Sequence, residues 1–328
     1  MKHRKNAKKI LFFGAILALL MVMLYSGFRI LEATVFYQPE IVQEQTSRKT
    51  IERDGVEYFP RQDQTIVMVL GIDQYGPVVD SGTYNNHGAA DMVMLMIFDE
   101  ANETYNILQL NRDTMVEMPV LGIGGKEAGT YFGQLALAHT YGSGLEDSCE
   151  NTRKAVSNLL YGLTIDYYVA MNMDAIAILN DAVGGVTVNV TEDFSQVDPS
   201  IQRGVMTLMS QQAINYVRTR KDVGDQLNLT RLQRQREYMD GFREAFRQKQ
   251  VEDPQFVVTA YQDVSSYLVT DCSANVISGM ADRYGDYKMG EIVSLSGENI
   301  LGEEYFEFYL DEEKLDADIL RLFYAPKN

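Results

Sequence analysis

The chain has 328 residues, of which 46% are apolar and 23% are charged, and its formal net charge is -17. This length and apolar content predict one large globular domain, or one domain with a small annex, and exclude a disordered or low-complexity protein. So acidic a chain is not expected to bind nucleic acid.

The N-terminus joins a basic segment to a long apolar one. Residues 10–28 carry no charged side chain, and Lys or Arg residues are frequent in 1–9. A helix over this apolar segment reaches about 28 Å, which is close to the hydrocarbon thickness of a bilayer. We expect a single-pass transmembrane anchor at 10–29 in the cell membrane, with residues 1–9 as a cytoplasmic basic tail and the rest of the chain extracellular. A cleaved signal peptide is the alternative, although its apolar region would be shorter.

The first predicted strands follow a polar segment. Residues 30–62 are mixed and polar, which predicts an extracellular stalk. A continuous apolar run at 65–73 predicts a strand that is buried on both faces. Two more strands are predicted at 90–99 and 104–114, and the residues EANE between them predict a hairpin turn.

Helices and strands then alternate along the chain. Helices are predicted at 132–142, 146–163 and 174–185, from Ser210 to about 217, and from about 228 to 248, and strands at 165–173 and 185–191. Residues 269–298 predict one more helix and strand. The alternation indicates the α/β class: a single αβα domain at 63–300, with a central, mostly buried mixed sheet flanked by helices, followed by a C-terminal tail at 301–328.

The cysteines and the short motifs of common enzyme classes give little information about the function. Cys149 and Cys272 can form a disulfide in an extracellular chain, but their separation in sequence does not give their geometry, so two buried free thiols are an equal alternative. The chain has no CxxC, HExxH, P-loop or GxSxG motif. The common zinc, nucleotide and serine-hydrolase classes therefore have no support.

Positive charge gathers in one segment of this acidic chain, residues 216–237. On a helical projection its second half has an apolar stripe, which consists of Leu232, Met239, Phe242 and Phe246. Arg231 and Gln235 stand at the margin of that stripe and are predicted to face a pocket, whereas Arg234 points away and is predicted to be a solvated surface charge. Arg218 and Arg220 lie two apart, on the same side of an extended segment, so their guanidinium groups can converge.

Converging arginines are suited to phosphate oxygens, because each guanidinium presents a fixed planar fork of donors. Surface ion pairs with nearby acids are the alternative explanation. Upstream, Asp73 closes the first buried strand, Asp91 opens the second and NRDT at 111–114 closes the third. Strand ends are where α/β sheets place ligands, and carboxylates opposite arginines suit a pyrophosphate bound with a divalent metal.

The order of these motifs resembles a known family. The segments that carry the likeness are VLGID, ADMVMLMIFDEANETYNILQLNRDT, LALAHTYG, IDYYVAMNMDAIAILNDAVGGVTVNV and LMSQQAINYVRTRKDVGDQLNLTRLQRQREYM. They follow one another as in the LytR-CpsA-Psr family of bacterial cell-envelope proteins, from about 65 to 300. The segment YVRTR…GD…R…RQ is the most specific part.

The resemblance implies a phosphotransferase of cell wall assembly. Such a protein takes a glycopolymer from a polyprenyl (undecaprenyl) pyrophosphate carrier, attaches it to peptidoglycan with Mg²⁺ or Mn²⁺ as cofactor, and releases polyprenyl phosphate. By the same resemblance, Asp73 and Asp91 bind the metal, and Asp91, Arg112 and Arg220 are catalytic. The residues implied at the pyrophosphate are Arg112, Arg218, Arg220, Arg231, Asp225 and Gln235. An apolar tunnel for the lipid is implied between sheet and helices, with residues of 174–183 among its lining.

The chain departs from the family pattern at two places. Ala89 and Ala90 stand where the family usually has Arg and Ser, and Gln134 and Ala136 stand where it usually has Lys and Asn. Two other functions therefore stay open beside that of an active ligase. One is a membrane-tethered binding or regulatory protein that holds the polyprenyl phosphate without transfer, and the other is a pyrophosphatase. The sequence does not distinguish teichoic acid from capsular polysaccharide or another wall glycan as the polymer.

Overall fold

The computed structural model describes residues 50–122, 125–219, 223, 228–302 and 305–327, all within one compact unit that spans Arg48–Asn328. The predicted anchor at 10–29 and the basic tail at 1–9 lie outside these residues. In the described part of the chain, none of the helices combines the length and apolarity needed to cross a bilayer.

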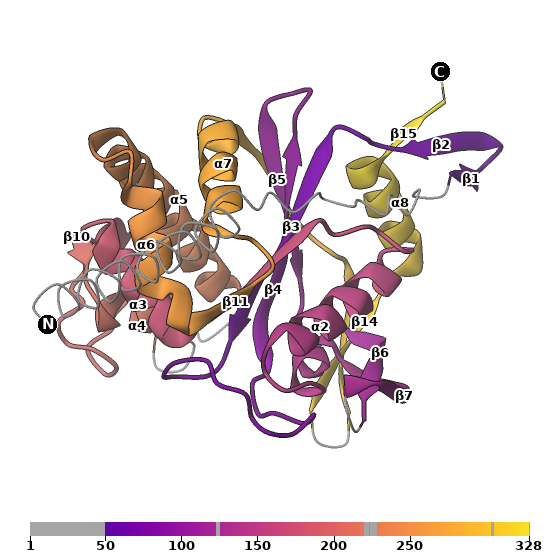
Figure 1. The fold of residues 1–328 in the computed structure, drawn as a ribbon, viewed down its shortest axis with the longest axis horizontal. Coiled ribbons are helices and arrows are strands. Elements are labelled where there is room, and N and C mark those ends of the chain that lie inside the picture. Colours follow the sequence, from indigo (N-terminus) through magenta and orange to yellow (C-terminus); the bar gives the residue numbers. More distant parts are fainter. Residues whose placement is uncertain (1–49, 123–124, 220–222, 224–227, 303–304, 328) are drawn as a thin grey trace, which may run out of the picture. The chain divides into compact units, whose positions relative to one another are not determined.

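A six-stranded mixed sheet forms the centre of the domain (Figure 1). Its order is β11 (Leu268–Thr270), β8 (Tyr167–Asn172), β3 (Gln64–Ile72), β4 (Ala90–Asp99), β5 (Thr104–Leu110) and β12 (Lys288–Ser294). Strands β3, β4 and β5 are antiparallel neighbours, whereas β8 is parallel to β3 and β12 is parallel to β5. The predicted central mixed sheet is confirmed, but the third predicted strand ends at Leu110, which leaves NRDT in a loop.

The first face of the sheet is covered by α2 (Glu146–Leu159) and α8 (Glu312–Phe323). Ile66, Met68 and Leu70 of β3 are fully buried there. Helix α8 adds Leu315, Ile319, Leu322 and Phe323 to the same core, at the spacing that puts apolar side chains on one helix face. Residues 312–323 are therefore part of the domain, and the prediction of a tail at 301–328 is wrong.

The start of the described chain also belongs to the fold. Within the predicted stalk at 30–62, β1 (Ile51–Arg53) pairs with β2 (Val56–Pro60), and β2 pairs with the last strand, β15 (Tyr324–Pro326). Backbone hydrogen bonds between segments so distant in the sequence cannot be read from either segment alone. The domain therefore begins before residue 63.

The second face of the sheet is turned towards a helical part, so the prediction of helices on both faces is confirmed (Figure 1). Its helices are α3 (Met173–Ala182), α4 (Gln211–Arg218), α5 (Asn228–Glu252), α6 (Phe256–Val264) and α7 (Ala274–Tyr284). The predicted strand at 185–191 is β9 (Val186–Val190), which pairs only with β10 (Gly204–Leu208) in the described chain and does not join the central sheet. Strand β9 and helix α4 contribute to a separate core with Phe194 and Tyr216.

One predicted helix is wrong. Residues 132–142 consist of the end of β7 (Glu127–Gln134), which pairs with β6 (Met115–Leu121), and of a short 3-10 helix, η2 (Leu135–Thr140). Leu135, Ala136 and Ala138 of η2 are buried, so the apolar pattern of this segment imitates an amphipathic helix without forming one. A second small hairpin consists of β13 (Gly297–Leu301) and β14 (Phe306–Leu310). A bridge between Thr114, the residue before β6, and Phe308 joins the two hairpins.

Both cysteines are buried and free, which decides between the two alternatives left by the sequence. Burial raises the pKa of the Cys149 thiol strongly and raises the pKa of the Cys272 thiol to about 11. Since the thiolate is the reactive form, we expect iodoacetamide at about pH 8.5 to label neither cysteine in the folded protein and both after denaturation. Mass spectrometry of the labelled protein checks this, and a label on the folded protein, or a mass that shows a disulfide, would contradict it.

Candidate functional site

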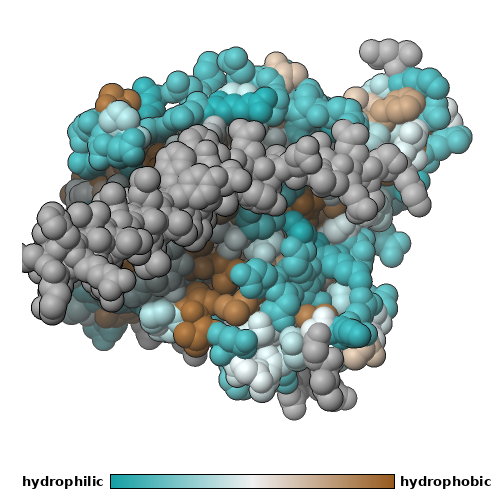
Figure 2. All heavy atoms as spheres, viewed as in Figure 1, coloured by the Kyte–Doolittle hydropathy of each residue, from teal (hydrophilic) through white to brown (hydrophobic). Residues whose placement is uncertain are grey.

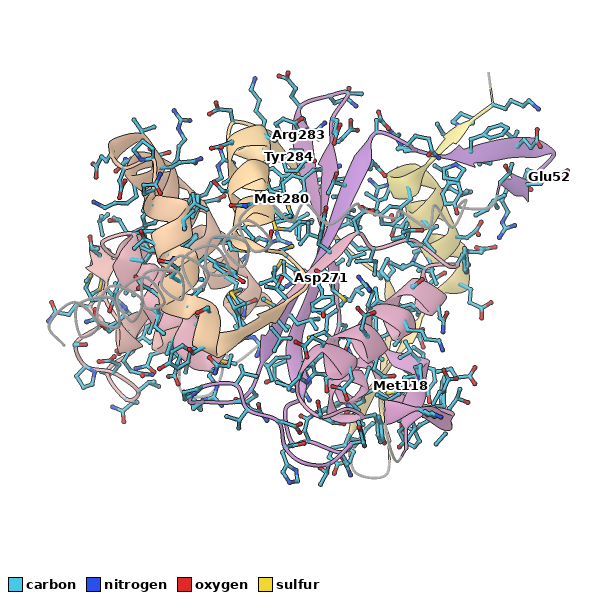
Figure 3. All side chains as sticks on the ribbon, viewed as in Figure 1. Glu52, Met118, Asp271, Met280, Arg283 and Tyr284 are labelled. Atoms are coloured by element: carbon cyan, nitrogen blue, oxygen red, sulfur yellow. The ribbon has the colours of Figure 1, made fainter. Side chains whose placement is uncertain are left out.

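A large cavity lies between the second face of the sheet and the helical part, with a volume of about 1750 Å³. Its lining is mainly apolar and includes Val69, Met94, Met96, Phe98 and Ile107 from the sheet, Ile176 and Leu179 from α3, Met239, Phe242 and Phe246 from α5, and Met280 and Tyr284 from α7. The last two are labelled in Figure 3. Figure 2 shows that hydrophobic residues gather near the middle of a largely hydrophilic surface. The cavity exceeds the usual size of a drug-like site and fits a long apolar chain.

The lining combines flexible side chains from the sheet with helix residues that the sequence predicted. Met92, Met94 and Met96 alternate along β4 and point to this face, and unbranched thioethers adapt to irregular apolar ligands. Ile176 and Leu179 come from the segment 174–183 that was expected to line a lipid tunnel.

Polar side chains also line the cavity. Asp91, Arg112, Arg218, Arg231 and Gln235 are among them, although they come from four separate segments of the chain. The structure therefore brings together five of the predicted site residues. Two others, Arg220 and Asp225, lie outside the described residues.

A β-bulge positions Asp91. Gly71 pairs with Met92 and Ile72 pairs with Ala90, which leaves Asp91 as the extra residue of β4. Bulges redirect a side chain and are frequent next to active sites. Here the redirected carboxylate of Asp91 accepts a hydrogen bond from the guanidinium of Arg112.

The NRDT loop positions Arg112. Asn111 accepts a hydrogen bond at its side chain from the backbone of Asp113, 3.0 Å away, and the Thr114 hydroxyl donates to the Asn111 carbonyl at 2.7 Å. Such turns are typical of Asn, whose side chain imitates a backbone turn. The guanidinium of Arg112 then stands between the carboxylates of Asp91 and Asp113, with its Nε 3.4 Å from the latter.

A second arginine–carboxylate pair lies at the neighbouring strand end. Arg218 donates to Asp73 at 2.8 Å and to the hydroxyl of Tyr75, also at 2.8 Å, and its guanidinium lies over the Tyr75 ring. Arg218 is the last residue of α4 and not part of an extended segment, so the expectation for its backbone is wrong. Asp73 also lies close to the start of β4, because its backbone nitrogen donates to the carbonyl of Ala89 at 3.1 Å.

Arg234 is not a surface charge. Only 2% of this residue is exposed, and its guanidinium donates to the carbonyls of Tyr216 and Thr219 while lying over the ring of Phe194. The prediction failed because the side of α5 turned away from the cavity is covered by α4 and by β9, which a projection of one helix does not show. Arg234 therefore holds the backbone on both sides of Arg218.

Gln235 has a similar scaffolding contact, since its side-chain nitrogen donates to the Val217 carbonyl at 3.1 Å. Both Gln235 and Arg231 line the cavity. The side chain of Leu232, expected in the apolar stripe, lies outside the described part. Met239, Phe242 and Phe246 of that stripe line the cavity.

Three residues at the site were not predicted. Tyr75 contacts Arg218, and Asp113 contacts both Arg112 and Gln134, whose side-chain nitrogen donates to the Asp113 carboxylate at 3.0 Å. Two of them could have been found from the sequence. Asp113 belongs to the NRDT segment at a strand end, and Gln134 is one of the departures from the family pattern. Tyr75 had no such signal beyond its closeness to Asp73.

The acidic residues fit a metal ion only in part. In the residues that the structure describes, no three His, Cys, Asp or Glu side chains form a cluster that could hold a metal. Asp73 and Asp91 lie at adjacent strand ends and offer two carboxylates. Mg²⁺ usually binds through one or two carboxylates together with substrate phosphates, so this donor set suits an ion shared with a phosphate ligand.

The fold and the site define a class of protein. A long apolar cavity that ends at arginines and carboxylates suits an amphiphile with an anionic head group. The chain belongs to the LytR_cpsA_psr family, whose sequence profile matches residues 33–318. The resemblance found in the sequence is thereby confirmed.

Two of the similar relatives have the names of transferases. The polyisoprenyl-teichoic acid–peptidoglycan teichoic acid transferase TagU of Oceanobacillus iheyensis is 24% identical over 225 residues, which cover 67% of this chain and 64% of that protein. TagU of Bacillus subtilis is 27% identical over 193 residues, which cover 59% and 56%. Both matches span less than two thirds of the relative's length. The solved structure of TagT bound to LI-WTA shares the fold, with a TM-score of 0.59 at 24% identity, over 84% of this chain and 95% of that one.

Proposed function

We propose that this protein transfers a glycopolymer from a polyprenyl pyrophosphate carrier to peptidoglycan and releases polyprenyl phosphate. The observation that carries the proposal is the continuity of one cavity from an apolar interior to Asp91, Arg112, Arg218 and Arg231. Family membership and the transferase names of the relatives support it. The apolar part would hold the polyprenyl chain and the arginines the pyrophosphate.

The transfer is a substitution at phosphorus. An acceptor hydroxyl oxygen forms a bond to the sugar-linked phosphorus, and the bond from that phosphorus to the bridging oxygen breaks. The hydroxyl proton passes to a base, for which Asp91 is the candidate, and the bridging oxygen leaves with the lipid phosphate. Arg112 and Arg218 stabilise the charge that develops on the phosphate oxygens, which is the main catalytic contribution in such reactions.

Asp73 and Asp91 are the residues that would hold Mg²⁺ or Mn²⁺. When bound, the ion supplies further positive charge to the pyrophosphate. We also propose that residues 10–29 anchor the protein in the cell membrane as a single pass, with the N-terminus in the cytoplasm and the domain outside. This arrangement gives the domain access to both the lipid carrier and the wall.

The test is a transfer assay with the full chain in detergent. The substrates are a polyprenyl pyrophosphate-linked saccharide and peptidoglycan fragments. We expect a covalent conjugate and free polyprenyl phosphate in equal amounts when Mg²⁺ is present, and loss of both products with EDTA. Mass spectrometry detects the conjugate.

Two results would contradict the proposal. Binding of the lipid without any product would indicate a binding or regulatory protein. Release of saccharide phosphate to water, without a conjugate, would indicate a pyrophosphatase.

A further inference from the structure

The small β13–β14 hairpin carries large apolar side chains that are exposed. Leu301 is 70% exposed, Phe306 is 59% exposed and Tyr305, in the connection between the strands, is 65% exposed. Soluble domains rarely leave a contiguous apolar group of this kind uncovered unless it contacts something. All three residues line the same cavity as Arg112 and Asp91.

The register of the hairpin shows why the tip is uncovered. Leu301 pairs with Phe306, and two residues further along β14 Phe308 is buried against the domain. Since side chains two apart lie on one face of a strand, Leu301 and Phe306 are on the face that is turned towards the domain. They remain exposed because at the tip this face overhangs the cavity.

Hydrogen bonds tie the hairpin to the predicted catalytic loop. The side-chain nitrogen of Gln134 donates to the Phe306 carbonyl at 2.8 Å as well as to the Asp113 carboxylate, and Asp113 is in contact with Arg112. The backbone nitrogen of Phe308 donates to the carbonyl of Asp113 at 2.8 Å. The apolar tip is therefore held in a fixed place next to the arginine.

We infer that the tip formed by Leu301, Tyr305 and Phe306 is the surface that receives the acceptor glycan. This inference rests on the proposed function. A nucleophile attacks phosphorus roughly in line with the leaving group, and here the leaving lipid phosphate carries the chain that occupies the cavity beside α5 and α6. The acceptor hydroxyl must then arrive from the opposite side, where Figure 1 shows β14 next to β6 and away from those helices.

The chemistry of the tip fits sugar rings. A hexose ring has an apolar C–H face that packs on aromatic side chains and a rim of hydroxyls that donate to oxygen acceptors. Residues 297–310 contain four Glu residues and no Lys or Arg. Such a segment repels anionic membrane lipids, whereas the apolar faces of sugar rings carry no charge for it to repel.

The test uses the full chain in detergent and a soluble peptidoglycan tetrasaccharide as the probe. Because the protein has no Trp, Phe306→Trp places a single fluorescent reporter at the tip. We expect its emission to change in a saturable way with the tetrasaccharide. By isothermal titration calorimetry, Leu301→Ser and Phe306→Ala are expected to weaken tetrasaccharide binding at least about tenfold.

Matched controls lie on the other face of the same hairpin. Ile300 is 48% exposed and Tyr309 is 39% exposed, so Ile300→Ser and Tyr309→Ala remove similar side chains and are expected to leave binding unchanged. Circular dichroism establishes that each variant is folded. Geranylgeranyl pyrophosphate, which probes the donor site, is expected to bind all variants equally.

Three results would overturn the inference. The first is unchanged tetrasaccharide binding in Leu301→Ser and Phe306→Ala. The second is a loss of geranylgeranyl pyrophosphate binding in these variants that is as large as their loss of tetrasaccharide binding. The third is binding of the tip to phosphatidylglycerol vesicles and not to the saccharide. Failure of the proposed function looks different. In that case the tetrasaccharide binds in a tip-dependent way but no conjugate forms in the transfer assay.

Discussion

Replacing Arg112 by alanine is expected to lower the rate of glycopolymer transfer by about 10²–10³-fold, the usual cost of removing one preorganised donor from a developing oxyanion. Arg112 stands between the carboxylates of Asp91 and Asp113. Without its charge those carboxylates would face the anionic pyrophosphate directly, so donor binding should weaken as well. The transfer assay gives the rate, and titration with geranylgeranyl pyrophosphate gives the affinity.

The matched control is Arg283→Ala. Arg283 is on α7, where it pairs with Glu100 at the surface and does not line the cavity (Figure 3). We expect this variant to transfer at the wild-type rate. Arg112→Lys retains the charge but loses the planar fork, and its rate should lie between those of Arg112→Ala and the wild type. Wild-type transfer by a folded Arg112→Ala protein would remove Arg112 from the proposed site.

The second large effect concerns Arg234. Arg234→Ala leaves the carbonyls of Tyr216 and Thr219 without the donor that now satisfies them, and it removes the charge that lies 3.9 Å from Glu192. We expect the free energy of unfolding to fall by about 3 kcal/mol, because buried groups that lose their partner retain the cost of desolvation. For a domain of this size the melting temperature should fall by roughly 6 °C or more, measured by circular dichroism.

Arg236→Ala is the control for stability. It removes the same side chain two positions further along α5, where Arg236 is exposed. A surface substitution of this kind changes the free energy of unfolding by no more than about 0.5 kcal/mol. Equal melting temperatures for the two variants would mean that Arg234 does not hold the end of α4 in the way that its hydrogen bonds indicate.

Much of the fold follows from local patterns in the sequence. The apolar runs at 65–73 and 90–99 are long and strongly biased, and both segments are strands of the central sheet. Helix α2 was also predicted from a local signal, since the segment 146–163 ends at a glycine as helices commonly do. Where an element depends on its pairing with another strand and not on its own pattern the prediction failed, as in β7, whose strand is defined by pairing with β6.

The candidate site was predictable to the extent that single residues have a characteristic chemistry. Arginines and carboxylates at strand ends indicated a phosphate ligand, and the structure places Asp91, Arg112, Arg218, Arg231 and Gln235 at one cavity. The contacts among them were not predictable. The bulge that redirects Asp91 depends on the register between β3 and β4, and the link from Gln134 to the β13–β14 hairpin joins residues more than 170 positions apart.

The sequence by itself determined the class of the fold, the family and the kinds of side chain at the site, because periodicity and motif order are properties of the chain alone. Only the tertiary structure decided that Arg234 is buried and that residues 312–323 complete the core. It also decided that a hairpin with an apolar tip lines the same cavity as the arginines. The physical reason is that burial depends on which other elements cover a face. A pattern within one element shows that the element has two different faces, but not what lies against each of them.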